Sequence, residues 1–275
     1  MPESQVERLR RLDGFHSFRT AELFFPILVA TVAAVLFLRD TWGSSALALL
    51  LLPVFLLGQA FKRNRERQED IVDFSTALAG MIEEVDPYTR RHSIRVAAYA
   101  ERLARGLGLP EGNVRQIRLA GLLHDVGKVG QERAVLQKPG PLDPMERRRM
   151  EAHPVAGAEI IRQVRGLQDV AVLVRHHHER PDGGGYPARL KGDSIPLGSR
   201  VVLIADAFDA MTSDRPYRTG MPGDRAVAEL RRHAGKQFDA RVVETLARMR
   251  EHGEFEIIQR ESHDIAHDPS HDLDR

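Results

Sequence analysis

The sequence contains no cysteine among its 275 residues. This absence excludes disulfide bridges and every metal site that depends on thiolate ligands. A bound metal would have to be held by histidine nitrogens and carboxylate oxygens, and the chain offers 12 histidines for that purpose.

A strong excess of charge of either sign is also missing, because the formal net charge is only +1. No broad basic field favours nucleic acid, so we expect no nucleic-acid partner. Acidic residues gather in the last part of the chain, where His263-Asp264, His267-Asp268 and His271-Asp272 form a repeat. Pro269 interrupts this repeat and no apolar face accompanies it. Residues 253–275 are therefore predicted to form a solvated, disordered tail rather than a metal site.

Two apolar runs stand near the N-terminus, at residues 23–38 and 42–61. A membrane span needs about 20 apolar residues, so the second run is long enough and the first is marginal. Basic residues flank the outer ends of both runs, which favours cytoplasmic termini. We predict a two-helix transmembrane hairpin over residues 21–61 of a multi-pass inner-membrane protein, after a cytoplasmic segment at 1–20. A buried hairpin in a soluble domain and a signal peptide are the alternatives.

A linker helix is predicted over residues 62–75, followed by the main domain at 76–252. The apolar positions along one helical face here are Ile71, Phe74, Leu78, Met81 and Val85. This spacing suits either a dimeric coiled coil or the first core helix of the main domain. The core helix is favoured because two heptads are short for a coiled coil.

The main domain is expected to be helical throughout. Apolar residues follow a helical spacing after Thr89, over 114–126 and again over 226–249. Asp143-Pro144-Met145-Glu146 has the cap, proline and glutamate of a helix start, and Pro154 is expected to end that helix at His153. Residues 201–205 would suit a buried strand, but helices on both sides favour a buried helix. The predicted fold class is all-α.

His124 and Asp125 stand side by side at the end of an apolar stretch. On a helix the two side chains would point about 100° apart, so the carboxylate could reach a second metal that the imidazole cannot. Lys128 would share the face of His124 at i,i+4, where its charge could meet an anion bound to the metal. One such pair is weak evidence by itself, and it gains weight from other potential ligands elsewhere in the domain.

Further side chains of metal-ligating type occur along the domain. They are His92, His153, His176, His177, His178, Asp206 and Asp209. His92 alone would more often be a surface residue or a cap, whereas His153 lies at a predicted helix end. The three adjacent histidines precede a glycine-rich turn that lets backbone approach a ligand closely.

Together these motifs resemble the HD-GYP family of cyclic di-GMP phosphodiesterases, a branch of the HD phosphohydrolases, from about residue 78 to about residue 249. The residues that carry the resemblance are Asp86-Pro87-Tyr88-Thr89 with His92, Leu123-His124-Asp125-Val126-Gly127-Lys128, Arg175-His176-His177-His178-Glu179, Gly185-Tyr186-Pro187, Asp206 with Asp209, and Arg215-Pro216-Tyr217-Arg218.

The resemblance implies an HD-domain helical bundle with the HD-GYP extension, and two divalent metal ions, iron or manganese. The ligands of one metal would be His92, His124, Asp125 and Asp206. The ligands of the second would be Asp125, His153, His177 and His178, with Asp125 bridging. His176 would lie behind the ligands, and Asp209 would pair with a neighbouring cation.

The resemblance also implies the roles on the substrate side. Lys128, Arg215 and Arg218 would contact substrate phosphates, while Gly185 and Tyr186 would line the guanine side of the pocket. Asp125 and Lys128 would be catalytic, and the two metals would activate a bridging water. The implied partners are cyclic di-GMP and a lipid bilayer, with a homodimer and diguanylate cyclase-type signalling proteins as further candidates.

One position departs from the family pattern. Members with three metals have a glutamate four residues before the first histidine, where this chain has Tyr88. A phenol, with a pKa of about 10, is a poor ligand near neutral pH, so two metals and the linear product pGpG are expected. A non-catalytic cyclic di-GMP receptor and an enzyme for another cyclic dinucleotide are the rival interpretations.

Overall fold

The computed structural model describes residues 29, 30, 32, 52–63, 65, 66, 69, 71–80, 92–136, 138, 140–214 and 219–253. The chain divides into two compact units between Asp73 and Phe74, and each unit is described by itself. In the first unit, all the described residues are helical, and the longest described stretch is 52–63. Most of the predicted hairpin at 21–61 lies outside the described residues.

The predicted inner-membrane location is contradicted by the helices that the structure describes. None of them is both long enough and apolar enough to cross a membrane. The described stretch at 52–63 carries exposed Leu52, Phe55 and Phe61.

The core of the second unit is built from α3 (His92–Gly106), α4 (Glu111–Leu123) and α9 (Leu197–Thr212), which pack on one another. In α3, Val96, Tyr99 and Leu103 recur every three or four residues and are fully buried. This spacing places them on one stripe of the helix, which is why α3 packs with that face inward.

Helix α9 is buried on several sides, including the run at 201–205. The prediction of a buried helix there, rather than a strand, is confirmed. Residues on all faces of such a helix can be apolar because neighbouring helices cover it all round. Asp206 and Asp209 follow this run in α9, and Asp209 is buried.

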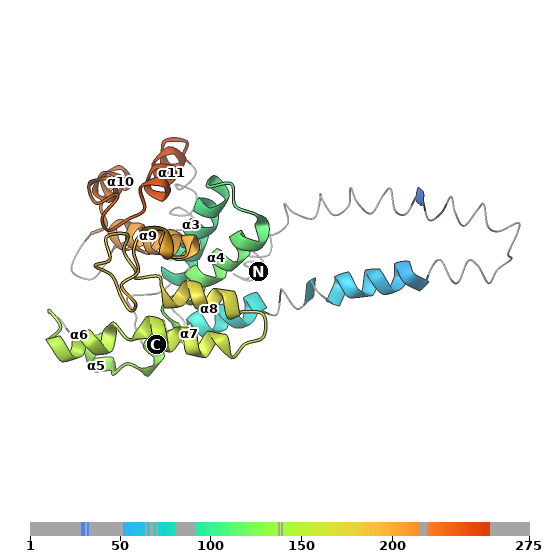
Figure 1. Cartoon of the computed structure of the whole chain (residues 1–275), viewed down its shortest axis with the longest axis horizontal. Coiled ribbons are helices and arrows are strands. Elements are labelled where there is room, and N and C mark those ends of the chain that lie inside the picture. The colour runs from blue at the N-terminus through green and yellow to red at the C-terminus, as the bar shows by residue number, and fades with distance from the viewer. Residues whose placement is uncertain are drawn as a thin grey trace, which may run out of the picture. The chain divides into compact units, whose positions relative to one another are not determined.

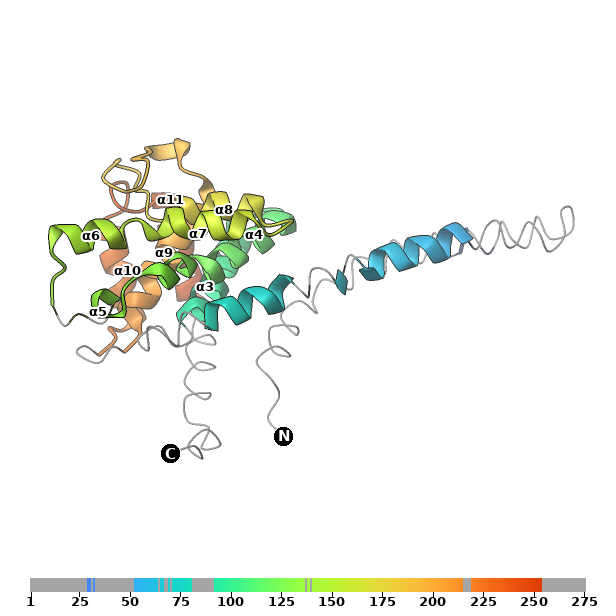
Figure 2. The same cartoon turned by 90° about the horizontal axis from the view of Figure 1, so that it is seen from below.

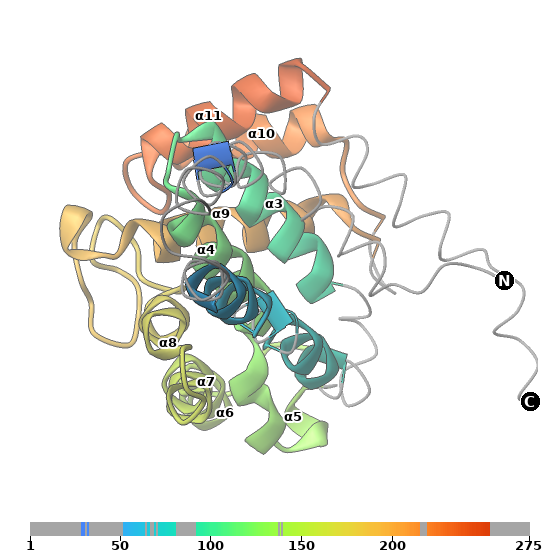
Figure 3. The same cartoon turned by 90° about the vertical axis from the view of Figure 1, so that its right-hand side faces the viewer.

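The remaining helices flank this core. They are η3 (Val126–Gly130), α5 (Arg133–Leu136), α6 (Pro144–Met150), α7 (His153–Arg162), α8 (Gln168–Arg175), η4 (Gly192–Ser194), α10 (Gly223–Arg232) and α11 (Ala240–Glu251). Helix α7 packs on α8 and η3, and α10 packs on α11 (Figure 1; Figure 2). Figure 3 shows these two pairs on opposite sides of α3, α4 and α9.

The predicted all-helical character of the main domain holds for the described residues. They contain no strand longer than the isolated bridge between Ala234 and Phe238. Asp143 accepts hydrogen bonds from the backbone N–H of Met145 and Glu146 at 2.7 and 2.9 Å, so the predicted helix start is confirmed. Thr89, after which the first of these helices was expected to begin, lies outside the described residues.

Two predicted helix ends differ from the structure. Helix α6 stops at Met150 instead of continuing to His153, which begins α7 with Pro154 in its first turn. Proline is well accommodated there because the first backbone N–H groups of a helix have no partner within the helix. Helix α4 ends at Leu123 rather than Val126, so a turn and the 3₁₀ helix η3 carry the His-Asp-Lys motif.

Candidate metal centre

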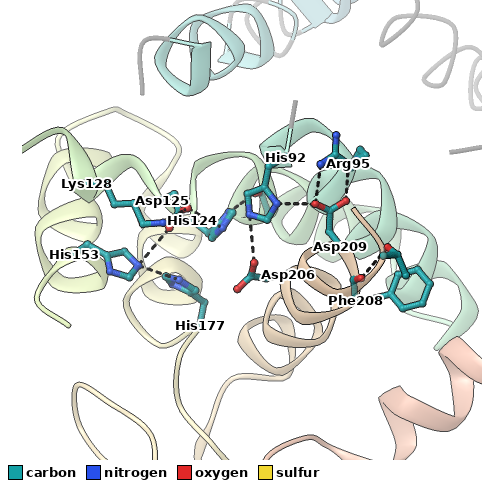
Figure 4. Close-up of polar contacts among 12 residues, drawn as sticks. His92, Arg95, His124, Asp125, Lys128, His153, His177, Asp206, Phe208 and Asp209 are labelled. Carbon is teal, nitrogen blue, oxygen red and sulfur yellow. Dashed lines mark hydrogen bonds and ion pairs between the residues drawn. The ribbon is translucent and has the colours of Figure 1, made fainter. Parts of the chain in front are cut away.

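Side chains from five parts of the chain converge between α3, α7 and α9 (Figure 4). His92 is the first residue of α3, and His153 is the first residue of α7. His124 and Asp125 occupy the turn after α4. His177 and His178 follow α8, and Asp206 lies in α9. Most of these groups therefore sit at helix ends, where a side chain can point along the helix axis toward a shared centre.

The first cluster consists of His92, His124 and Asp125, all of them buried. One potential ligand atom from each residue lies within 4.8 Å of those of the other two. Asp206 borders this cluster, because its Oδ1 lies 3.3 Å from Nε2 of His92. The donor set is two imidazoles and two carboxylates.

The second cluster consists of His153, His177 and His178, whose ligand atoms also lie within 4.8 Å of one another. Asp125 stands between the two clusters. Its Oδ2 is 3.4 Å from Nε2 of His124, and its Oδ1 is 3.4 Å from Nε2 of His153. One carboxylate thus presents an oxygen to each side, which is the geometry that a bridging ligand requires.

Backbone carbonyls fix the orientation of three of the imidazoles. Nδ1 of His124, His153 and His177 donates to the carbonyl oxygen three residues earlier, at 2.8, 2.7 and 2.6 Å. A carbonyl only accepts, so each Nδ1 carries a proton and each Nε2 faces the centre. Imidazoles and carboxylates are the donor set that divalent iron, manganese or zinc can use.

His92 is held differently. Its Nδ1 lies 2.7 Å from Oδ2 of Asp209, and Asp209 also accepts hydrogen bonds from Nε and Nη2 of Arg95 at 2.6 and 2.9 Å. The predicted pairing of Asp209 with a cation is confirmed. Arg95 was not identified as that cation from the sequence, although it lies one helical turn after His92 on α3.

Burial lowers the pKa of all three histidines of the second cluster. Burial holds the pKa of His177 well below its ordinary value, with His178 and His153 adding to the effect. Burial also lowers the pKa of His178 to about 4 and depresses the pKa of His153. Near neutral pH these rings are therefore unprotonated, as metal ligands must be.

The first cluster has the opposite balance. Burial alone would lower the pKa of His92, but its hydrogen bonds with Asp206 and Asp209 raise it to about 10. Burial disfavours the charged forms of the two central carboxylates, yet neighbouring positive groups outweigh it. The pKa of Asp125 is held well below its usual range by His124 and Lys128, and that of Asp206 by His92. In the metal-free state a proton on His92 thus balances carboxylate charge, and a metal that bound there would displace this proton.

Lys128 contacts Asp125 rather than sharing the face of His124. Its Nζ lies 2.6 Å from Oδ2 of Asp125, because η3 replaces the expected continuation of α4. Gly127 has no side chain for a packing reason, since a Cβ there would overlap the carbonyl oxygen of His153. The close contact between η3 and α7 brings His153 to the centre.

The loop after the three histidines lies against the second cluster. The ring of Tyr186 is 4.8 Å from the ring of His178, centroid to centroid. Gly185 packs on the backbone of residues 178–180, where a Cβ would overlap Arg180 and His178. Glu179 was not singled out from the sequence. Its buried carboxylate accepts hydrogen bonds from the backbone N–H of Ala188 and Leu190 at 2.6 and 2.9 Å.

Some predicted site residues are not in these clusters. His176, which was expected to lie behind the ligands, has its Nδ1 3.7 Å from Oε1 of Glu179. Arg215, Arg218 and Tyr88 lie outside the described residues. Their predicted roles stay predictions, as do the exact ligands of each metal.

Comparisons with known proteins identify the family of this chain. A family model described as HD domain matches residues 76–242. The 3'3'-cGAMP-specific phosphodiesterase 3 of Vibrio cholerae is 41% identical over 56% of this chain and 33% of its own length. A cyclic di-GMP phosphodiesterase response regulator of Xanthomonas campestris is 43% identical over 63% of this chain and 46% of its own.

A solved structure supports the fold alone. The structure titled as a cyclic GMP-AMP specific phosphodiesterase of Vibrio cholerae aligns with 70% of this chain and 52% of its own, at 22% identity and a TM-score of 0.54. The chain spans between a third and a half of the length of the curated relatives above. Because the family model covers more than half of the chain, this protein belongs to the HD domain family.

Proposed function

We propose that this protein is a metal-dependent phosphodiesterase that hydrolyses cyclic di-GMP to the linear dinucleotide pGpG. The observation that carries the proposal is the position of Asp125, with one oxygen 3.4 Å from His124 and the other 3.4 Å from His153. Two clusters that share one carboxylate are suited to two adjacent metal ions. Several relatives are named as cyclic dinucleotide phosphodiesterases, which supports the reaction class.

The proposed ligands are those implied by the family resemblance, four for each metal with Asp125 shared. When bound, a metal pair supplies Lewis acidity toward a phosphoryl oxygen and lowers the pKa of a coordinated water. The protein's own part is to hold the Nε2 atoms toward the centre and to exclude bulk water by burial. Three of these nitrogens are already oriented by carbonyl contacts to Nδ1.

Lys128 is proposed to act on the substrate phosphate. Its ammonium lies beside Asp125 and its side chain retains 19% exposure, so it is reachable from outside while close to the centre. A fixed positive charge there stabilises negative charge that grows on phosphoryl oxygens in the transition state. Arg215 and Arg218 are proposed to contact phosphates as well.

Tyr186 and Gly185 are proposed to bind the base side of the substrate. The Tyr186 ring lies over His178 and stays partly exposed. An aromatic face of this kind can stack on a purine. Glu179 anchors the far part of the same loop through two backbone N–H groups.

A second candidate substrate is 3'3'-cGAMP, because three relatives carry that specificity in their names. The two substrates differ in one purine, so Tyr186 stacking alone would accept both. The proposed product, pGpG, follows from two metals rather than three, since Tyr88 stands where a third metal would find a carboxylate.

The test uses the full chain, stripped of metal and reloaded with Fe(II) or Mn(II) without oxygen. Cyclic di-GMP and 3'3'-cGAMP are incubated separately, and products are separated by chromatography. We expect cyclic di-GMP to give pGpG with little GMP. Asp125→Ala should lose turnover and both metals, whereas Asp224→Ala, which changes a carboxylate 84% exposed, should retain both.

Binding of either dinucleotide by the metal-loaded chain without any hydrolysis would overturn the proposal in favour of a receptor. Faster hydrolysis of 3'3'-cGAMP than of cyclic di-GMP would keep the reaction and change the substrate. Turnover that survives in Asp125→Ala after its metal content is measured would refute the shared role of that carboxylate.

A further inference from the structure

The two clusters differ in what contacts Nδ1 of one histidine. His124 in the first cluster and His153 and His177 in the second each donate Nδ1–H to a neutral backbone carbonyl. His92 instead has the carboxylate of Asp209 at 2.7 Å from its Nδ1. A carboxylate behind a metal-binding imidazole raises the electron density at the opposite nitrogen, and therefore raises its strength as a ligand.

The charge on Asp209 is locked in place. Arg95 binds both of its oxygens, at 2.6 and 2.9 Å, and the Asp209 side chain is 1% exposed. A two-pronged contact of this kind fixes orientation as well as charge. Arg95 and His92 both lie in the first turn of α3. The same short segment therefore carries the His92 imidazole and the Arg95 guanidinium that orients Asp209 behind it.

Helix α9 contributes to both sides of the His92 ring. Asp206 faces Nε2 at 3.3 Å and Asp209 faces Nδ1, one helical turn further along (Figure 4). The first cluster therefore has the carboxylates of Asp125 and Asp206 beside His92, and a third carboxylate, that of Asp209, contacts Nδ1 of His92. The second cluster has three imidazoles and shares only Asp125.

From this asymmetry the geometry points to Arg95 and Asp209 as a positioning pair that makes the metal position at His92 the tighter of the two. The position at His153, His177 and His178 would fill second and lose its metal first. The inference rests on the proposed function, because it takes the same two metal positions.

The experiment is a titration of the metal-free full chain with Mn(II), followed by calorimetry and by the electron paramagnetic resonance of free Mn(II). We expect one tight and one weaker equivalent in the unsubstituted chain. Asp209→Asn should weaken the tight equivalent by about 10- to 100-fold and leave the weaker one unchanged. His177→Ala should remove the weaker equivalent alone, which assigns each equivalent to its cluster.

Two further variants make the test specific. Arg95→Gln combined with Asp209→Asn leaves no unpaired buried charge, so it addresses the inference even if Asp209→Asn alone does not fold. Arg200→Gln is the matched control. Arg200 also lies in α9 and is paired with a buried carboxylate, Asp239, at 2.7 Å, but away from the candidate ligands. It should leave both equivalents unchanged.

Equal affinities in the unsubstituted chain would overturn the inference. Loss of the weaker equivalent in the Asp209 variants would also overturn it. The inference would fail as well if Arg200→Gln weakened the tight equivalent as much as the double variant does. Two unequal equivalents with the expected response, in a chain that hydrolyses no dinucleotide, would support this inference and refute the proposed function. Fewer than two equivalents in the unsubstituted chain would refute both.

Discussion

The ammonium of Lys128 lies 2.6 Å from Oδ2 of Asp125, the same oxygen that faces His124. Without metal, the lysine supplies part of the positive charge that Asp125 needs at its buried position. The contact joins the residue proposed to be shared by two metals to the residue proposed to meet the substrate phosphate. A substitution of Lys128 therefore also tests the role proposed for Asp125.

Lys128→Ala is expected to lower turnover of cyclic di-GMP by about 100-fold, because it removes one group that stabilises charge in the transition state. Both metals should remain bound, since no proposed ligand is lost. Turnover under saturating substrate and metal content by mass spectrometry check the two parts. A variant that binds no metal would contradict the assignment of Lys128 to the substrate.

Gly127→Ala is expected to lower the free energy of unfolding by about 1–3 kcal/mol through overpacking against α7. The added Cβ would meet the carbonyl of His153, so the second metal equivalent should be weakened as well. Urea unfolding and Mn(II) titration measure these effects. Gly130→Ala is the matched control in the same 3₁₀ helix, because nothing lies within 4 Å of its added Cβ.

Glu179→Gln is expected to raise the KM for cyclic di-GMP with little change in metal content. The buried carboxylate holds the backbone of Ala188 and Leu190, and an amide can accept at only one of its two positions. The loop that carries Tyr186 would then be less well ordered. Steady-state kinetics with measured metal content is the test, and a fall in kcat at unchanged KM would be the contrary result.

The stability of the metal-free domain is expected to depend on pH with two limbs. His178 has its pKa lowered from 6.5 to about 4, so the unfolded chain binds more protons between these values and acidification destabilises the fold. His92 has its pKa raised from 6.5 to about 10, so its contribution is present below pH 6.5 and is lost as pH rises toward 10.

Together these shifts predict maximal stability of the metal-free domain at about pH 6.5. Urea unfolding at several pH values between about 5 and 9 measures the two limbs. His92→Asn should flatten the alkaline limb and leave the acid limb in place. Stability that rises from neutral to alkaline pH in the unsubstituted domain would contradict the environment described for His92.

The sequence predicted the features that local patterns determine. Apolar spacing indicated α3 and the buried helix α9, and the capping residues located the start of α6 at Asp143. Adjacent histidines and aspartates selected candidate ligands because metal chemistry limits which residue types can serve. Assignment to two particular metals came only from the family resemblance and remains a prediction.

Other features depend on contacts between distant residues. Arg95 and Asp209 are 114 positions apart in the sequence, and no local pattern predicts that they pair. Helix α4 ends before η3, where Gly127 lies close to α7. This break in the helix gives Lys128 a different partner from the one expected on a continuous helix. The prediction of an inner-membrane location is contradicted. None of the helices in the part of the chain that the structure describes is long and apolar enough to span a bilayer.

The imidazoles of His124, His153 and His177 are each aimed by a peptide group rather than by a neighbouring side chain. Amino-acid replacement cannot delete a main-chain oxygen, so drift in the surrounding side chains leaves the aim of these rings intact. A change in the path of the chain has the reverse effect. One residue inserted into the final turn of α4, α6 or α8 would rotate a carbonyl away and misdirect the ring that depends on it. The centre is thus tolerant of substitution in these turns and intolerant of length variation.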